Sequence, residues 1–180
     1  GVLCDWEEPP TAFLKELLGE LERQLADRGL QLYVPEEYAF CTKKAGLLVS
    51  SALCGGSLEL RLKEGLERFG PDRLVLALQR SAEDFQLPAP EGRGRILKEE
   101  ELKQMLRERQ PGVFFSWELC ARYFTYVDRR GQPHFVLFDD GDTMARKLEV
   151  GRGVGVRCFA AVWPEICDAA DRMGLQTVRT

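Results

Sequence analysis

Short apolar runs alternate with amphipathic segments along most of this chain, and this alternation limits the folds that it can adopt. Apolar residues recur at helical spacing in the amphipathic segments, whereas the runs between them have the length of strands. Strands that alternate with helices form a parallel sheet covered by helices, which buries both faces of each strand. We therefore predict an α/β fold, built as a single domain over residues 1–180.

The expected elements follow from these runs and from the residues that start and stop helices. Strands are predicted at 1–6, 30–34, 46–51, 73–79 and 156–163, and helices at 11–28, 58–69, 98–109, 143–150 and from Pro164 onward. Two further apolar runs, 123–127 and 134–138, indicate a hairpin. Thr143 is the expected cap of its helix, and the stretch 88–94, rich in Pro and Gly, is expected to be a loop.

The composition argues against several classes of function. The 180 residues are 44% hydrophobic and 30% charged, as in an ordinary globular domain. A net charge of −4 without a basic arm argues against nucleic-acid binding. No apolar run reaches the ~18 residues of a membrane span, so none is expected. Six cysteines form no CxxC pair and accompany one histidine, so we expect mostly free thiols, a reducing compartment, no metal site and no cofactor.

Carboxylates gather at the end of the first predicted strand. Alternation along residues 2–7 sends Leu3, Asp5 and Glu7 to one face of the sheet and their neighbours to the other, toward the helices. Two carboxylates on one face repel each other, so the pKa of one should rise and let it act as a general acid near neutrality. The alternative is a simple acidic loop before a helix.

The same segment resembles a family of glycosidases. Gly1, Asp5, Trp6 and Glu7 match the end of the DxxDxDxE motif of glycoside hydrolase family 18. Similar segments follow in order, and they are 73–76, 84–88, 123–128, Gly131, His134, 138–140, Thr143, Lys147 and Gly155. Of these, 73–76 and 84–88 would be the seventh strand and the loop after it. The segments from 123 to 140 resemble a hairpin of the spore-wall, LysM-associated branch, and the last three residues continue it. The resemblance implies strands four to eight of a (β/α)₈ TIM barrel, with covering helices.

The resemblance also implies a chemistry. Family 18 enzymes hydrolyse glycans that contain N-acetylglucosamine, such as chitin or peptidoglycan, and the substrate's own acetamido group is the nucleophile. By analogy Glu7 would protonate the glycosidic oxygen, and Asp5 would orient the acetamido group. Both would lie at the carboxyl ends of the barrel strands, where active sites of this fold are found.

Several positions depart from the family pattern. Leu3 replaces a motif aspartate, and the residues at 49–52 lack the tyrosine–aspartate pair expected on the sixth strand. Ser81 stands where a sugar-facing tyrosine is usual, and Val162 stands where a tryptophan is usual. These losses remove binding energy that would otherwise act at the transition state. The alternative function is therefore a catalytically inactive carbohydrate-binding or structural module derived from the same barrel.

An active enzyme would need replacement sugar-binding side chains. We expect them to be Tyr33, Phe85 and Trp163, although Trp163 comes one residue late and a shift of one residue turns a side chain to the other face. Glu36 and Glu37 either line the same mouth as Glu7 or belong to a solvated loop. The expected partner is a glycan, in a cytoplasmic, spore or cell-wall setting.

Five strands leave a barrel open. A full barrel takes roughly 250 residues, and an open half would expose sheet edges and an apolar inner face. We expect either that the chain is part of a longer product or that two copies close the barrel as a homodimer.

Three other patterns are better explained by structure than by chemistry. The stretch 138–143 has the wrong order for a phosphatase motif, and its aspartates suit a helix start. Glycines at 151, 153 and 155 precede a strand, the reverse of a dinucleotide fingerprint. His134 lacks a second histidine and a placed nucleophile, so a triad is unsupported.

Overall fold

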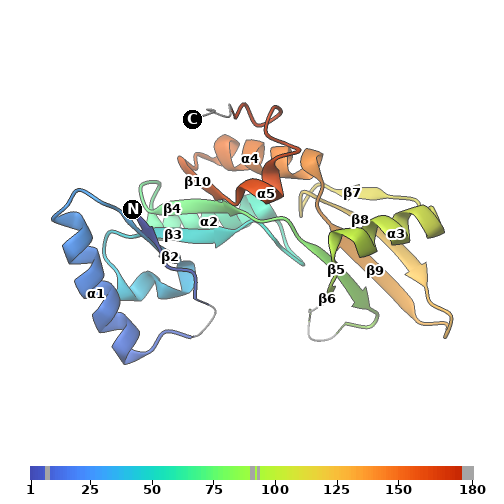
Figure 1. Ribbon diagram of the computed structural model, residues 1–180, viewed down its shortest axis with the longest axis horizontal. Helices are drawn as coiled ribbons and strands as arrows, with labels where there is room; N and C mark the ends of the chain where they lie inside the picture. The colour runs from blue at the N-terminus through green and yellow to red at the C-terminus, as the bar shows by residue number, and fades with distance from the viewer. Residues whose placement is uncertain (7–8, 90–91, 93, 176–180) are drawn as a thin grey trace.

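The computed structural model contains two sheets of five strands each, which lie side by side (Figure 1). It describes residues 1–6, 9–89, 92, 94–175. The first sheet has the order β1-β2-β3-β4-β10, and every neighbouring pair in it is parallel. Its strands are β1 Val2–Leu3, β2 Leu32–Pro35, β3 Gly46–Ser50, β4 Leu74–Leu78 and β10 Cys158–Ala161. All five begin within or next to the strands predicted from the apolar runs.

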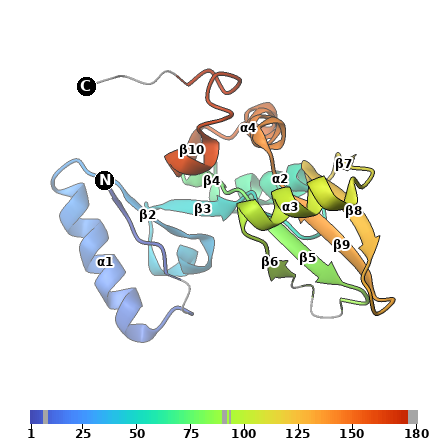
Figure 2. The same ribbon diagram turned by 45° about the vertical axis from the view of Figure 1, so that its right-hand side comes forward.

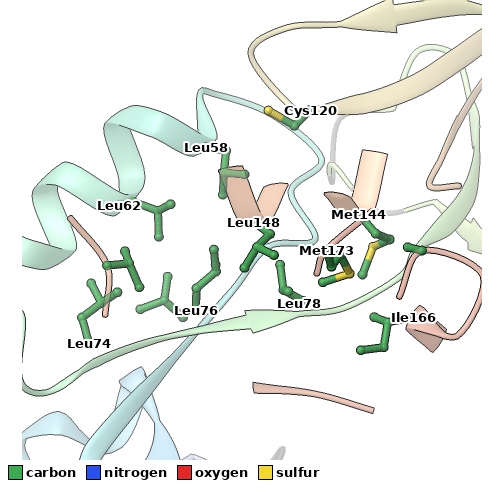
Figure 3. Close-up of a cluster of buried hydrophobic side chains, with 13 residues drawn as sticks. Leu58, Leu62, Leu74, Leu76, Leu78, Cys120, Met144, Leu148, Ile166 and Met173 are labelled. Atoms are coloured by element: carbon green, nitrogen blue, oxygen red, sulfur yellow. The ribbon is translucent and has the colours of Figure 1, made fainter. Parts of the chain in front are cut away.

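Helices cover the outer face of the parallel sheet. They are α1 Ala12–Ala26, the 3₁₀ helix η1 Glu36–Cys41, α2 Leu58–Phe69, α4 Gly141–Val154 and the short α5 Trp163–Ile166. Figure 3 shows the core between them and the sheet, where leucines from α2 and β4 meet Met144 and Leu148 of α4. Leu74, Leu76 and Leu78 all point into this core, so their even-numbered face is the outer one and the odd-numbered face of β4 lines the inside. The arrangement is that of five consecutive strands of a (β/α)₈ barrel.

Local signals explain where the helices begin and end. The Ser57 hydroxyl accepts a hydrogen bond from the backbone N–H of Leu60, and Gly70 with φ 81° ends α2, so the predicted bounds of this helix are confirmed. The predicted cap of α4 was wrong. Asp140 caps it by accepting from the backbone N–H of Thr143, and the Thr143 hydroxyl accepts in turn from the Asp140 backbone N–H. The N-cap therefore lies three residues earlier than predicted.

The second sheet is antiparallel and is inserted between β4 and α4. It has the order β6-β5-β9-β8-β7, and its strands are β5 Ala82–Gln86, β6 Arg95–Ile96, β7 Phe114–Ser116, β8 Ala121–Val127 and β9 Pro133–Phe138. The predicted hairpin of β8 and β9 is confirmed. The interpretation of 84–88 as a loop was wrong for its first three residues, because β5 pairs with β9 along its whole length.

Helix α3 Glu99–Arg109 lies across one face of this inserted sheet (Figure 2). Leu102 packs there against Phe124, Val136 and Phe138, which are all buried. The sheet therefore has a core of its own, separate from the core of the parallel sheet.

A buried ion pair joins the two sheets. Lys147 of α4 donates to the Asp139 carboxylate at 2.7 Å, with side chains 1% and 0% exposed. The same carboxylate accepts from the Ser81 backbone N–H at 3.0 Å and from the Thr143 hydroxyl at 2.9 Å. A buried charge needs such partners, and here they hold the entrance and the exit of the insertion together.

Candidate functional site

A cleft of about 330 Å³ opens at the carboxyl ends of the parallel strands, on the inner face of the sheet. Every parallel strand or the segment that follows it contributes, through Asp5, Glu36, Ser50, Gln79 and Val162. Catalytic residues of barrel enzymes lie at this end of the strands, because the loops there converge. The cleft is therefore the candidate site.

Asp5 reaches the cleft because side chains alternate along the first strand. Leu3 and Asp5 line the cleft, whereas Cys4 and Trp6 pack into the core under α1, with the Trp6 ring 5.8 Å from that of Tyr38. This is the alternation predicted from the sequence. Glu7 lies outside the described residues.

A carboxylate and a guanidinium stand on the β2 side of the cleft. Glu36, directly after β2, forms an ion pair with Arg61 of α2, and both side chains line the cleft. Burial raises the pKa of Glu36, and the nearby Arg61 charge partly opposes that rise. The Glu36 side chain is 18% exposed, so this is a partly buried carboxyl that accepts a proton more readily than an ordinary glutamate. Glu37 lies beside it on the cleft lining and is exposed.

A serine and a glutamine are hydrogen-bonded across β3 and β4. The Ser50 hydroxyl donates to Gln79 Oε1 at 2.5 Å and accepts from the Ala52 backbone N–H at 3.0 Å. The Gln79 backbone N–H donates to the Ser51 hydroxyl at 3.1 Å. Both the backbone and the side-chain oxygen of Gln79 are thereby held in place at the rim.

The rest of the described lining is aliphatic, with Leu3, Leu48, Ala77, Ala160 and Val162 among its members. Within the described part of the chain, no aromatic side chain lines this cleft. Sugar rings usually bind by stacking on such rings, so the cleft offers hydrogen bonds and small apolar surfaces in their place.

The structure places the three predicted sugar-binding side chains elsewhere. Tyr33 lies on the inner face at the amino ends of the strands, where a Cβ at Gly46 would come within 2.6 Å of its ring. Phe85 is 6% exposed and packs in the inserted sheet against Ala121 and Leu137. Trp163 begins α5 and is 47% exposed, next to the cleft-lining Val162. Of the predicted catalytic and sugar-binding residues that the structure describes, Asp5 alone lines the cleft, whereas Glu36 and Glu37 line it as in the first of their two alternatives.

Sequence reasoning missed Ser50, Arg61 and Gln79. Ser50 and Gln79 are 29 residues apart, and Glu36 and Arg61 are 25 apart, so no local spacing connects them. One signal was available, because a polar residue at the carboxyl end of a buried parallel strand of a barrel points to the site.

Two negative findings hold for the described residues. They contain no group of three or more His, Cys, Asp or Glu side chains that could hold a metal ion. Among them, no helix has both the length and the apolar character needed to cross a membrane.

Comparison with known proteins shows the fold. No family model and no curated protein sequence matches the chain. Among solved structures, the spore cortex-lytic enzyme SleL of Bacillus megaterium has a TM-score of 0.67 at 14% identity, over 92% of this chain and 46% of that one. A chitinase of Chromobacterium violaceum has a TM-score of 0.64 at 16% identity, over 89% and 60%.

A class V chitinase of Nicotiana tobaccum, solved in complex with NAG4, has a TM-score of 0.66 at 14% identity, over 97% of this chain and 68% of that one. The chain therefore has the fold of part of a chitinase-like barrel, and the predicted fold class, a partial TIM barrel, is confirmed. It spans about half to two thirds of the length of the structures it matches.

Proposed function

We propose that this chain forms part of a glycoside hydrolase that cleaves glycans containing N-acetylglucosamine, either chitin-like or from peptidoglycan. The observation that carries the proposal is the cleft at the carboxyl ends of the parallel strands, which exposes the Asp5 carboxylate. Supporting it, the fold matches proteins described as chitinases and as a spore cortex-lytic enzyme. In this proposal Glu7 is the general acid and Asp5 orients the acetamido group of the sugar.

The described residues suit this division of labour. Asp5 follows β1 and lines the cleft, so its carboxylate can meet a ligand without any change in the strand. A carboxylate beside a developing oxazolinium charge stabilises it electrostatically, which is the kind of contact that strengthens in a transition state. Substrate-assisted hydrolysis needs no second carboxylate as nucleophile.

The proposal is tested by release of a fluorophore from N-acetylglucosamine oligomers. Glu7→Gln should lower the rate by about 10²–10⁴-fold, because general acid catalysis contributes that much. Asp5→Asn should lower it as well, with little change in binding of the oligomer. Glu8→Gln, one residue further along the chain, is the matched control and should keep its activity. Equal rates for Glu7→Gln and the wild type would contradict the proposed acid.

The second candidate is a carbohydrate-binding module without catalysis. The aliphatic character of the described cleft favours it, because fewer stacking surfaces leave less binding energy for the transition state. This candidate would be favoured over the hydrolase if the chain binds the oligomer but shows no fluorophore release that depends on Glu7. The homodimer, one of the two alternatives drawn from the sequence, stays a prediction, which sedimentation analysis at micromolar concentration would test.

A further inference from the structure

We propose that Gln79 is a specificity-determining residue, which recognises the acetamido group of the sugar through its side-chain N–H donors. The inference rests on the proposed function, because it assumes an N-acetylated glycan in the cleft. Gln79 directly follows β4, so it lines the cleft on the β4 side, whereas Asp5 lines it on the β1 side.

The orientation of the Gln79 amide is fixed by its neighbours. Its oxygen accepts from the Ser50 hydroxyl at 2.5 Å, and that hydroxyl is itself held by the Ala52 backbone N–H at 3.0 Å. With the oxygen engaged, the amide presents its two N–H donors on the remaining side. The side chain lines the cleft and is exposed there, and no described residue accepts a hydrogen bond from its Nε2.

Small side chains leave room beside these donors. Ser50, Ala77 and Ala160 are register partners on three neighbouring strands, so they form one row across the inner face of the sheet. Gln79 follows Ala77 by two residues and therefore lies on the same face, one step nearer the carboxyl end. The methyl groups of the two alanines are apolar, and both alanines line the cleft.

An acetamido group matches this arrangement in both of its parts. Its carbonyl oxygen needs a donor, which Gln79 Nε2 supplies, and its methyl group needs a small apolar surface, which Ala77 and Ala160 supply. A free amino group at the same carbon is protonated and offers only donors, so it would face the Gln79 donors without an acceptor. The geometry thus favours N-acetylglucosamine over glucosamine.

The test is a binding titration with two probes, the N-acetylglucosamine trimer and the glucosamine trimer. Gln79→Leu should weaken binding of the acetylated trimer by about threefold to tenfold, the usual value of one hydrogen bond, and leave the glucosamine trimer unchanged. Gln79→Glu should weaken the acetylated trimer and strengthen the glucosamine trimer, because a carboxylate accepts from an ammonium group. Ser50→Ala should have a smaller effect in the same direction as Gln79→Leu.

Gln86→Leu is the matched control, since Gln86 is also an exposed glutamine but lies at the end of β5 in the inserted sheet. A second readout follows the Gln79 side-chain amide in ¹⁵N-resolved spectra, where the acetylated trimer should shift the signal that Gln79→Leu removes. If the wild type and Gln79→Leu bind the acetylated trimer equally, or if Gln79→Leu weakens both trimers equally, the proposed role of Gln79 is overturned while the proposed function stands. Failure of the wild type to bind either trimer would overturn the proposed function, and this inference with it.

Discussion

The two sheets of this molecule use their side chains in opposite ways. On the inner face of the parallel sheet, mostly small and aliphatic side chains and a few polar groups surround an open cleft. The inserted antiparallel sheet is rich in aromatic residues, and Phe114, Tyr123, Phe135 and Phe85 follow one another across four of its strands. Their ring centroids are 5.6, 5.2 and 6.2 Å apart in that order, so the rings pack on each other.

The opposite face of the insertion holds a polar cluster. The side chain of Asp84, 4% exposed, accepts from the Tyr126 hydroxyl at 2.8 Å and pairs with His134 at 2.8 Å. The Tyr126 ring also stacks on His134 and lies beneath the Arg109 guanidinium. Aromatic rings therefore pack against one another in the insertion, whereas the described lining of the cleft consists of aliphatic and hydrogen-bonding side chains. Four measurements would sharpen or break this contrast.

The largest effect is expected where the two sheets join. Lys147→Met removes the cation from a buried pair and leaves the Asp139 carboxylate buried with only neutral donors. Breaking such a pair costs about 3–5 kcal/mol of the free energy of unfolding, which urea denaturation would measure. The control is Lys63→Met, whose exposed pair with Glu59 on α2 should change stability by less than about 0.5 kcal/mol. A loss below about 1 kcal/mol for Lys147→Met would mean that Ser81 and Thr143 alone satisfy the carboxylate.

A smaller effect is expected inside the insertion. Tyr126→Phe removes one donor from the buried Asp84 carboxylate, which should cost about 1–2 kcal/mol. Tyr123→Phe is the control, because it keeps the stacked ring and no described residue bonds its hydroxyl. We expect this control to change the free energy of unfolding by less than about 0.5 kcal/mol.

The Tyr126 hydroxyl also predicts a pH dependence. Burial and the Asp84 carboxylate raise the pKa of Tyr126 to about 12, whereas a tyrosine in the unfolded chain has a pKa of about 10. The folded state thus holds this proton longer, so its contribution to stability is full below about pH 10 and is lost as the pH rises toward 12. The decline over that range should be weaker in Tyr126→Phe than in the wild type, as denaturation at a series of pH values would show.

The smallest effect belongs to the cleft itself. Burial raises the pKa of Glu36, whereas the hydrogen bond from Lys63 lowers the pKa of the exposed Glu59. An NMR titration that follows the side-chain carboxyl carbons should therefore show that Glu36 loses its proton at higher pH than Glu59. Arg61→Leu should raise the Glu36 pKa further, because it removes an opposing charge.

The sign of the Glu36 effect on stability follows from the same shift. A raised pKa in the folded state means that the contribution of Glu36 to stability is present below the unfolded pKa and falls as the pH rises through the folded one. Titration of Glu36 together with Glu59 or below it would contradict the desolvation of this carboxyl.

The elements that the sequence predicts well are those with local signals. Helix α2 was predicted to the residue, because Ser57 and Gly70 act within one turn of its ends. Strand β5 was missed, because its segment carries Glu83 and Asp84, and charged residues are rare in the middle of a sheet. Asp84 is acceptable there because of partners that are distant in sequence, Tyr126 and His134 at 2.8 Å and Arg95 at 3.8 Å.

The site shows the same division. Alternation along the first strand placed Asp5 on the cleft face, since that periodicity is local. The pairs Glu36–Arg61 and Ser50–Gln79 each join residues on different strands or helices, so they depend on the packing of the whole sheet. The cap of α4 depends on both local and distant signals. Asp140 and Thr143 both suit a helix start, and the ion pair of Asp140 with the distant Arg122 favours Asp140 as the cap.

The hydrogen bond between Ser81 and Asp139 has a consequence for how the chain can change. These residues are 58 positions apart, yet they lie side by side where the chain leaves the parallel sheet and where it returns. Once β5 and β9 have paired, the segment between them is a closed loop. The number of residues in that loop then adds almost nothing to the entropic cost of bringing β10 beside β4. Whole hairpins could be gained or lost at the far end of the insertion while the barrel strands keep their register.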